Sequence, residues 1–287
     1  MPAPIVFPTI TARPNVTPRT ARRRFVTGEK VRAARAMRTG GVAATPARML
    51  ALIMPNTDKP IDKPAGKLGF RVLPSPARLA AALVARFHGL ASSNVADAMG
   101  RFNFMDPGMQ WRTGLPLAGI AVTVNSRPAD NLMIHKALAV AEPGDIVVVN
   151  TGGNVTSAVF GEMMCHTAAA RKLGGIVVDG AIRDVDGIAK LKFPAFSRSV
   201  SPGACDKDGP GEINVPVSCG GVVVMPGDIV VGDGDGVAVV PRAHAEDVLA
   251  LVAELVEREA KRIGEIKRGE HFRPDVDELL RKKGVIE

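Results

Sequence analysis

Two runs of β-branched residues, separated by one helix-length segment, constrain the fold of this chain more than any other feature. IVVVN (146–150) and IVVD (176–179) are nearly continuous apolar runs, as expected of strands that are covered on both faces. Between them, an apolar stripe at helical spacing runs from Val159 to Thr167 and ends before Gly174. Strand, helix and strand at this spacing predict a parallel, right-handed βαβ unit.

The rest of the ordered sequence predicts an α/β domain. Further helices are expected over 76–87, 95–99 (capped by Ser92 or Ser93), 131–141, 242–268 and after Pro274. Further strands are expected at 117–124 and 193–196, with several short ones and tight turns over 217–241. The long, highly charged helix 242–268 is expected to pack on a neighbouring subunit.

The first 66 residues differ from the rest in composition. They alternate Pro, Thr, Ala and Arg without sustained periodicity, and we expect residues 1–66 to be a mostly disordered extension. Three interpretations stay open: an organelle-type targeting peptide, a basic tail that touches RNA or an acidic partner, and a misassigned start with Met54 as the true beginning. Residues 67–287 are expected to form a single domain.

The net charge of +8 is concentrated in that extension. Residues 1–50 contain ten Arg and Lys residues against one acid, Glu29, a net +9 that leaves −1 on residues 51–287. The body of the protein therefore has no overall electrostatic bias toward phosphate, and nucleic acid is not the expected partner.

The expected compartment follows from apolar runs and cysteines. No apolar run approaches the roughly 18 to 20 residues that span a bilayer, and the start lacks the positive-then-apolar order of a secretory signal. The three cysteines, Cys165, Cys205 and Cys219, form no CxxC, which argues against a disulfide framework or a zinc cage. We expect a soluble, cytoplasmic protein with no membrane partner, in which Cys165 is buried filler.

Three charged residues that packing does not require lie around the βαβ unit. Glu162 is followed, after twenty residues, by the adjacent pair Arg183 and Asp184. Both strand-to-helix loops of a βαβ unit emerge at the carboxyl edge of the sheet, so these side chains are expected to converge there. An Arg fork suits a carboxylate or an enolate, and a carboxylate suits Mg²⁺. The alternative is an exposed ion pair in which Asp184 caps a helix over 185–191.

Weaker candidates surround this trio. The loop TGGN (151–154) would offer backbone N–H groups to an anion ahead of a helix N-terminus, with a surface turn as the alternative. His166 lies four residues after Glu162 on one helix face, as ligand pairs do, although a lone helical His is usually structural. Asp233 and Asp235 in GDGDG could form a metal loop, but a turn between two strands explains them better.

Five segments together resemble one known family. They are RPADNLMIHKAL (127–138), EPGDIVVVNTGGN (142–154), GIVVDGAIRDVDGI (175–188), FPAF (193–196) and PGDIVVGDGDGVAVVP (226–241). Over about residues 70–270 the chain resembles the RraA-like family, which contains the 4-hydroxy-4-methyl-2-oxoglutarate / 4-carboxy-4-hydroxy-2-oxoadipate aldolases and the regulator of ribonuclease E activity A. The resemblance implies a β/β/α sandwich of the swivelling-domain type, and homotrimers or homohexamers with active sites between subunits.

The resemblance to the aldolase branch also implies roles for the trio. Asp184 would ligate Mg²⁺ or Mn²⁺, and Arg183 would bind the pyruvate moiety and stabilise its enolate. Glu162 would contact a metal-bound water. Most aldolases of this branch have Asp where this chain has Glu162, and one extra methylene changes the reach of the carboxylate, so the resemblance leaves the substrate preference open.

The same resemblance extends the site beyond the trio. Backbone amides of the Gly-rich loop would hold the substrate carboxylate, so the substrate-binding residues it implies are Gly152, Gly153, Asn154, Gly161, Glu162 and Arg183. A glutamate from the C-terminal helix of a neighbouring subunit would complete the site. Glu259 is the better match for it and Glu257 the other.

We therefore predict a divalent-metal-dependent class II aldolase or decarboxylase. It would cleave 4-hydroxy-2-oxo acids to pyruvate, or remove CO₂ from oxaloacetate, through a pyruvate enolate held by Arg183 and the metal on Asp184. The rival prediction is a non-catalytic regulator that binds ribonuclease E and inhibits RNA processing. Asp184 favours the enzyme, because the best-known member of the regulator branch lacks the acid after the arginine.

Overall fold

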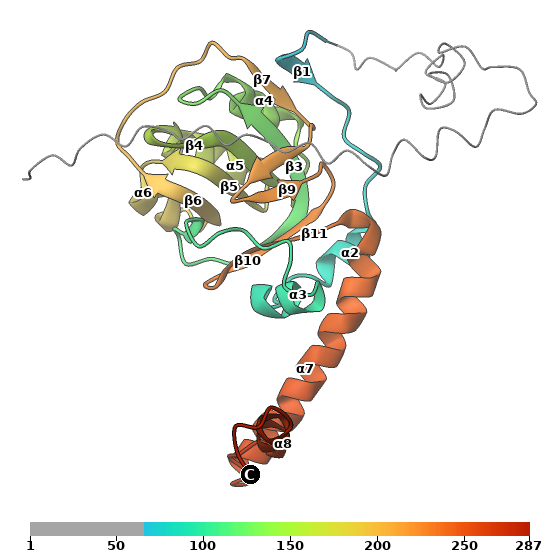
Figure 1. Cartoon of the computed structure of the whole chain (residues 1–287). Helices are drawn as coiled ribbons and strands as arrows, with labels where there is room; N and C mark the ends of the chain where they lie inside the picture. Colours follow the sequence, from blue (N-terminus) through green and yellow to red (C-terminus); the bar gives the residue numbers. More distant parts are fainter. Residues whose placement is uncertain (1–65) are drawn as a thin grey trace, which may run out of the picture. The chain divides into compact units, whose positions relative to one another are not determined.

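A nine-stranded mixed sheet is the framework of residues 66–287, the part of the chain that this computed structural model describes (Figure 1). The predicted extension lies outside the described residues up to position 65, as does Met54. The strand order is β1-β7-β3-β4-β5-β6-β2, and the hairpin β10–β11 continues from β3. The strands are β1 (Phe70–Val72), β2 (Gln110–Trp111), β3 (Leu117–Ser126), β4 (Ile146–Phe160), β5 (Gly175–Ile182), β6 (Ala195–Val200), β7 (Gly211–Ile213), β10 (Ile229–Asp233) and β11 (Gly236–Val240).

The predicted βαβ unit is confirmed at the centre of this sheet. Strands β3, β4, β5 and β6 are parallel neighbours, and the pairs Val147↔Ile176 and Val149↔Val178 fix the register between β4 and β5. Helix α5 (Glu162–Ala170) connects β4 to β5, as its apolar stripe predicts. Helix α6 (Val185–Lys190) follows β5 directly, so both strand-to-helix connections lie at one edge of the sheet.

Strand β4 is longer than predicted, and this corrects the position of the Gly-rich loop. Residues 151–156 belong to β4, which continues to Phe160 with register shifts after Asn150 and Asn154. Two successive glycines in the left-handed region, Gly152 (φ 67°) and Gly153 (φ 72°), produce the irregularity. The helix begins only at Glu162, so the loop is a bulge within a strand and does not directly precede a helix N-terminus.

The two faces of the central strands contact different layers. Alternate residues of β4 divide between two cores: Val147 and Val149 belong to one, and Ile146 and Val148 to the other. The first core lies under α4 (Leu132–Val140), α5 and α6. The second is closed by the β10–β11 hairpin and by the two-stranded sheet β8 (Val217–Cys219) and β9 (Val222–Val224). Helices, sheet and strands make three layers, which confirms the predicted β/β/α arrangement.

The first two helices differ in length from the prediction. Helix α2 spans only Ala81–Ala85 and is shorter than predicted, whereas α3 spans Ser92–Ala98 and begins three residues earlier than predicted. The predicted cap of α3 is wrong. The N-cap is Ala91, and the side chain of Ser92 instead donates a hydrogen bond to Asp233 at 2.6 Å.

The predicted long C-terminal helix is confirmed as α7 (Ala245–Lys267), preceded by a 3₁₀ turn and followed by α8 (Pro274–Lys282). Its first half packs on α3 and the β10–β11 hairpin through Val248, Leu249 and Val252. Its second half leaves Val256, Ile263 and Ile266 about half exposed. Packing of that half on a neighbouring subunit stays a prediction. Within residues 66–287, every helix is too short or too polar to cross a bilayer.

Candidate active site

Arg183 and Asp184 lie in the turn that leaves β5, beside the start of α5. The backbone N–H of Arg183 donates to the carbonyl of Phe160 at 2.9 Å, which ties the ends of β4 and β5 together. The carboxylate Oδ2 of Asp184 lies 3.5 Å from Arg183 Nε and accepts a hydrogen bond from the backbone N–H of Glu162 at 3.2 Å. The side chains of Arg183 and Asp184 therefore meet as expected, whereas Glu162 joins them only through its backbone N–H.

The conformation of Asp184 decides between the two interpretations of its local role. Asp184 occupies the N-cap position of α6, but it is left-handed (φ 58°, ψ 35°) and makes no side-chain cap to that helix. Its carboxylate caps the first turn of α5 instead. A non-glycine residue in this conformation costs about 1 kcal/mol or more, and such strain is concentrated at functional sites. The predicted side-chain cap of α6 is therefore wrong, whereas the exposed Arg183–Asp184 ion pair of the same interpretation is present.

Glycine at position 161 permits this close approach. A Cβ there would lie 2.7 Å from Asp184 Oδ2 and 3.1 Å from Arg183 Cγ. The backbone of Gly161 is extended (φ −152°), a conformation open to any residue. The requirement for glycine therefore comes from the packing of the two charged side chains against the backbone.

Glu162 is the first residue of α5, and its side chain turns away from the cavity toward α6. A Cβ on Gly187 of α6 would lie 2.4 Å from Glu162 Cδ, so the carboxylate rests on that glycine. His166 Nε2 lies 4.0 Å from Glu162 Oε1, a loose contact between two side chains that are about half exposed. No three His, Cys, Asp or Glu side chains within residues 66–287 are grouped as a metal site.

A cavity of about 290 Å³ opens beside Arg183 and Asp184. Its walls come from the end of β4, the start of α5, the start of α4 and the segment before β7; the polar residues that line it are Asn131, His135, Arg183, Asp184, Cys205 and Lys207. Asn131, His135 and Lys207 were missed by the sequence reasoning. The first two lie in the segment RPADNLMIHKAL, where helical periodicity gave no reason to separate them from the core.

Asn131 presents an unusual group to this cavity. The residue is 7% exposed, and its Oδ1 has no hydrogen-bond partner in the described part of the chain. Its Nδ2 donates to the carbonyl of Val159 at 3.3 Å and to Met164 Sδ at 3.5 Å. A buried acceptor without a donor costs on the order of 1–3 kcal/mol, so a ligand or water that donates a hydrogen bond would be favoured here.

Two titratable groups in the cavity have shifted pKa values. Burial, and then the positive charge of Lys207, lowers the pKa of His135 below its usual range, which favours the neutral imidazole. Burial raises the pKa of the Cys205 thiol. Cys165, behind the cavity in the core, is fully buried, and burial raises its pKa to about 11, which confirms the expected role as filler.

Comparison with known proteins places this site within a family. The family model described as "RraA-like: Aldolase/RraA" matches residues 92–239, which contain all of the cavity's polar residues. The chain belongs to the RraA-like family. It is 39% identical over 167 residues to a Halalkalibacterium halodurans protein named "Putative 4-hydroxy-4-methyl-2-oxoglutarate aldolase", an alignment that spans 58% of this chain and 80% of that protein.

Two solved structures are similar to this RraA-like chain. An uncharacterized protein from Pseudomonas syringae has a TM-score of 0.62 and 27% sequence identity, over 69% of this chain and 94% of that one. The RNA-processing inhibitor RraA from Thermus thermophilis has a TM-score of 0.50 and 26% identity, over 53% of this chain and 92% of that one. The family thus includes proteins with enzymatic and with regulatory names.

The Gly-rich loop of this RraA-like chain is not part of the cavity wall. Gly153 lies beside an ion pair of the neighbouring strands: its Cβ would be 3.8 Å from Arg198 Nε and 3.9 Å from Asp179 Oδ1. Asn154 uses its Oδ1 to accept from the backbone N–H of Ser157 at 3.0 Å. Gly152, Gly153 and Asn154 therefore do not line the cavity, whereas Met163 and Met164 in the first turn of α5 do.

Glu259 also lies apart from the cavity within one chain. It is on the exposed half of α7, where its Oε2 accepts a hydrogen bond from Asn94 Nδ2 at 3.0 Å. Its predicted role in the site of a neighbouring subunit stays a prediction, as does that of Glu257.

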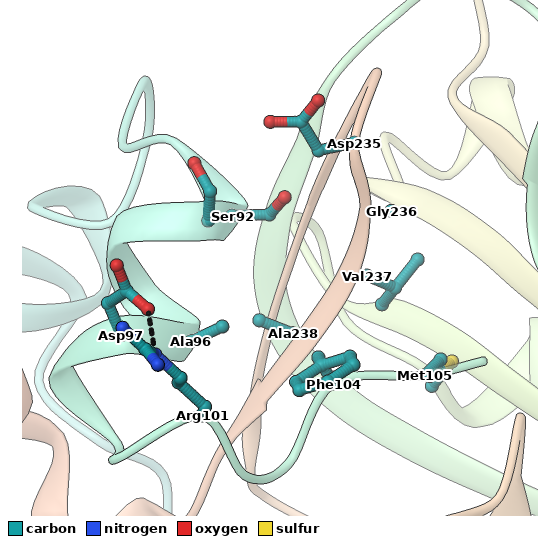
Figure 2. A pocket seen from close by; sticks show the side chains of 11 residues that line it. Ser92, Ala96, Asp97, Arg101, Phe104, Met105, Asp235, Gly236, Val237 and Ala238 are labelled. Carbon is teal, nitrogen blue, oxygen red and sulfur yellow. Dashed lines mark hydrogen bonds and ion pairs between the residues drawn. The ribbon is translucent and has the colours of Figure 1, made fainter. Parts of the chain in front are cut away.

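A second cavity, of about 340 Å³, lies between α3, the 101–105 segment and β11 (Figure 2). Figure 2 shows Asp97 and Arg101 bonded to one another at its side, at 3.3 Å, with Phe104 and Ala238 forming apolar walls. Asp235 is at its rim, in the turn between β10 and β11. Asp233 accepts from Ser92 and from the backbone of Asp235, as the turn interpretation of GDGDG predicts.

Proposed function

We propose that this chain is a divalent-metal-dependent lyase that cleaves 4-hydroxy-2-oxo acids to pyruvate and decarboxylates oxaloacetate. The observation that carries the proposal is the arrangement of Arg183, Asp184 and the N-terminus of α5 around one cavity. The aldolase name of the Halalkalibacterium halodurans relative supports the same reaction class.

The Asp184 carboxylate at this cavity suits a hydrated Mg²⁺ or Mn²⁺. Mg²⁺ is usually bound through one or two carboxylates and keeps several waters, so it does not need a cage of three protein ligands. Asp184 would be the direct ligand, because its carboxylate is 44% exposed and lines the cavity. The metal would supply Lewis acidity toward the 2-oxo group. Glu162, whose carboxylate lies against Gly187 outside the cavity wall, would act only through water.

The chain's own groups would hold the pyruvate end of the substrate. The guanidinium of Arg183, 47% exposed, offers a planar fork to the carboxylate and to the developing enolate oxygen. The first N–H groups of a helix have no intrahelical partner and attract anions, and here those of Met163 and Met164 are at the cavity. In retro-aldol cleavage the C4 hydroxyl gives its proton to water, C4 becomes a carbonyl as the C3–C4 bond breaks, and the electron pair passes to the C2 oxygen. Arg183 would stabilise the resulting enolate, which takes a proton from water at C3 to give pyruvate.

Groups on the opposite wall would recognise the rest of the substrate. The unpartnered Oδ1 of Asn131 would accept a hydrogen bond from the C4 hydroxyl, and Lys207 would pair with a second carboxylate. Together they favour a 4-hydroxy-2-oxo diacid over pyruvate-sized monoacids.

The test measures pyruvate release, coupled to lactate dehydrogenase, with Mg²⁺ and either oxaloacetate or 4-hydroxy-4-methyl-2-oxoglutarate. Asp184→Ala should abolish turnover, and Arg183→Lys should lower kcat/KM by about 10²-fold or more, because an ammonium cannot replace the fork. Asp235→Asn, an exposed aspartate outside the cavity, is the matched control and should keep wild-type rates. Equal rates for wild type and Asp184→Ala would refute the enzyme. Inhibition of ribonuclease E by the purified protein would then support the regulatory alternative.

A further inference from the structure

We propose that Asp130 is a positioning residue that connects two walls of the cavity through hydrogen bonds. One wall is the start of α4, with Asn131 and His135, and the other is the segment 204–207, with Cys205 and Lys207. The two walls are more than 65 residues apart in sequence, so their alignment needs a specific connection. The inference rests on the proposed function for its catalytic consequence, but its structural part can be tested separately.

The Asp130 carboxylate is saturated with donors from both walls. Oδ1 accepts from the backbone N–H of Leu132 at 2.9 Å, on the α4 side. Oδ2 accepts from the backbone N–H groups of Asp208 at 2.8 Å and Gly209 at 2.9 Å, on the other side. Arg127 Nη2 adds a charged donor at 3.2 Å. The carboxylate thus connects Asp130 to two residues that lie 78 and 79 positions later in the chain.

Backbone hydrogen bonds on both sides of Asp130 fix the position of the 205–209 segment relative to the start of α4. Asp206 donates its N–H to the carbonyl of Ala129 at 2.8 Å, and its own carbonyl accepts from the N–H of Asn131 at 3.0 Å. This two-bond bridge places Asn131 on one side of Asp130 and Lys207 directly after Asp206. Any shift of the 205–209 segment would therefore move Lys207 relative to Asn131 Oδ1.

Burial makes this carboxylate difficult to replace. The side chain of Asp130 is 0% exposed. Burial alone would raise its pKa, but the N–H donors and Arg127 outweigh burial and lower the pKa, so the group is charged at neutral pH. In Asp130→Asn an NH2 group, which cannot accept, replaces one of the two oxygens, so the N–H donors of one wall lose their acceptor and the contact between the walls is broken. The segment that carries Lys207 would then open more readily.

The cysteines of the native chain supply a probe that does not depend on activity. The chain has three cysteines, of which Cys165 and Cys219 are fully buried and Cys205 is partly exposed on the segment in question. The rate at which a disulfide reagent such as dithiobis-nitrobenzoate labels the native protein therefore reports the 205–209 segment.

The experiment compares Asp130→Asn with wild type and with Asp206→Asn, a carboxylate that is 70% exposed on the same segment. Asp130→Asn should label Cys205 at least about tenfold faster, with unchanged circular dichroism, because local opening controls thiol access. Asp206→Asn should label at the wild-type rate. Equal labelling of Asp130→Asn and wild type would overturn the inference.

Steady-state kinetics test the catalytic consequence of this role. Asp130→Asn should raise KM for a 4-hydroxy-2-oxo diacid about tenfold while kcat changes less, because it disturbs binding of the distal end. Adding Lys207→Ala to Asp130→Asn should cause no further loss, since the first change already misplaces the ammonium group. Additive effects of the two changes would contradict the positioning role.

Two further outcomes are decisive. If Asp130→Asn fails to fold, hydrogen exchange of the wild-type protein replaces it: the amides of Asp208 and Gly209 should be protected although Asp208 is exposed, and exchange at the unprotected rate would overturn the inference. If the wild type cleaves no 2-oxo acid while Asp130→Asn still exposes Cys205, the proposed function fails and the connecting role of Asp130 stands.

Discussion

The side-chain carboxylate of Asp184 accepts a hydrogen bond from the backbone N–H of Glu162, 3.2 Å away and 22 residues earlier in the chain. This bond joins the turn after β5 to the first turn of α5. Asp184 therefore holds the start of the helix whose first turn lines the cavity, in addition to its proposed role toward the metal. The two loops at the sheet edge behave as one unit, which makes their close contacts the most sensitive positions of the site.

Gly161→Ala is predicted to damage the site without unfolding the protein. The added Cβ would meet Asp184 Oδ2 at 2.7 Å and Arg183 Cγ at 3.1 Å, so one of the two side chains must move. The extended backbone of Gly161 accepts alanine without strain. We expect kcat/KM for pyruvate release to fall by about 10²-fold, the effect of misplacing a positioned group by roughly 1 Å, while Tm changes little.

Gly264→Ala is the control for this substitution. Gly264 is in α7, and its Cβ would find only the end of the Arg268 side chain, at 3.5 Å. Alanine in place of glycine inside a helix adds about 0.5–1 kcal/mol to the stability, so this variant should be slightly more stable and should leave the Asp184 contact intact. Gly161→Ala with wild-type kcat/KM would show that the contact with Asp184 does not matter for turnover.

Glu162 and Gly187 are predicted to be coupled. A Cβ at Gly187 would lie 2.4 Å from Glu162 Cδ, so Gly187→Ala must displace the carboxylate. Glu162→Asp shortens the side chain by one methylene and removes the overlap. We therefore expect Gly187→Ala to lower activity in the wild type and to have little effect in the Glu162→Asp background.

A double-mutant cycle on kcat/KM measures this coupling. Residues in contact show interaction energies of about 0.5–3 kcal/mol, whereas independent sites add within about 0.5 kcal/mol. Strict additivity of Gly187→Ala and Glu162→Asp would mean that the position of the Glu162 carboxylate is irrelevant to the reaction. The same cycle in urea unfolding separates a loss of stability from a loss of function.

The βαβ unit could be predicted because the hydrophobic pattern of residues 146–179 was sufficient to identify it. The runs at 146–150 and 176–179 are too apolar for strands with one solvent-exposed face, and the segment between them is long enough for one helix. That topology alone brings Glu162, Arg183 and Asp184 to one edge. What the sequence did not reveal was the length of β4, because Gly152 and Gly153 look like a loop in sequence and form a bulge in the sheet.

The far wall of the cavity could not be predicted for a different physical reason. Asn131 and Lys207 meet only through the bridge between Asp130 and Asp206, a contact between segments that share no local pattern. Asp130 looks like an ordinary helix-start aspartate in sequence, and its four donors become visible only in three dimensions. Long-range polar contacts of this kind leave no periodic signal.

Asp179 is predicted to be essential for the stability of the sheet edge. It is 7% exposed, and it accepts hydrogen bonds from Arg198 Nε and, at 2.8 Å, from the backbone N–H of Gly220. Asp179→Ala leaves that N–H without an acceptor and Arg198 with only Asp106 as partner. We expect a loss of roughly 2–4 kcal/mol in urea unfolding, whereas Asp247→Ala, an exposed acid on α7, should change stability by less than about 0.5 kcal/mol.

Glu212 is predicted to make stability depend on pH through its contact with the edge strand β1. Its side chain is 11% exposed, and it pairs with Arg71 across the register Arg71↔Glu212. The hydrogen bond from Arg71 lowers the pKa of the Glu212 carboxyl; burial opposes this, and the N–H of Gly69, at 3.0 Å, reinforces it. The folded state therefore binds this proton less readily than the unfolded state.

A lowered folded-state pKa gives the sign of the effect. The stabilisation is complete above the unfolded pKa of about 4.3 and is lost as the pH falls through the lower folded pKa. Glu212→Gln should therefore have a lower Tm than wild type at pH 7, and the difference should shrink steadily below about pH 4.3. Glu278→Gln removes an exposed i,i+4 pair with Lys282 and should shift Tm little at any pH. A gap between Glu212→Gln and wild type that stays constant from pH 7 down to acid unfolding would show that packing, and not charge, accounts for the contribution of Glu212.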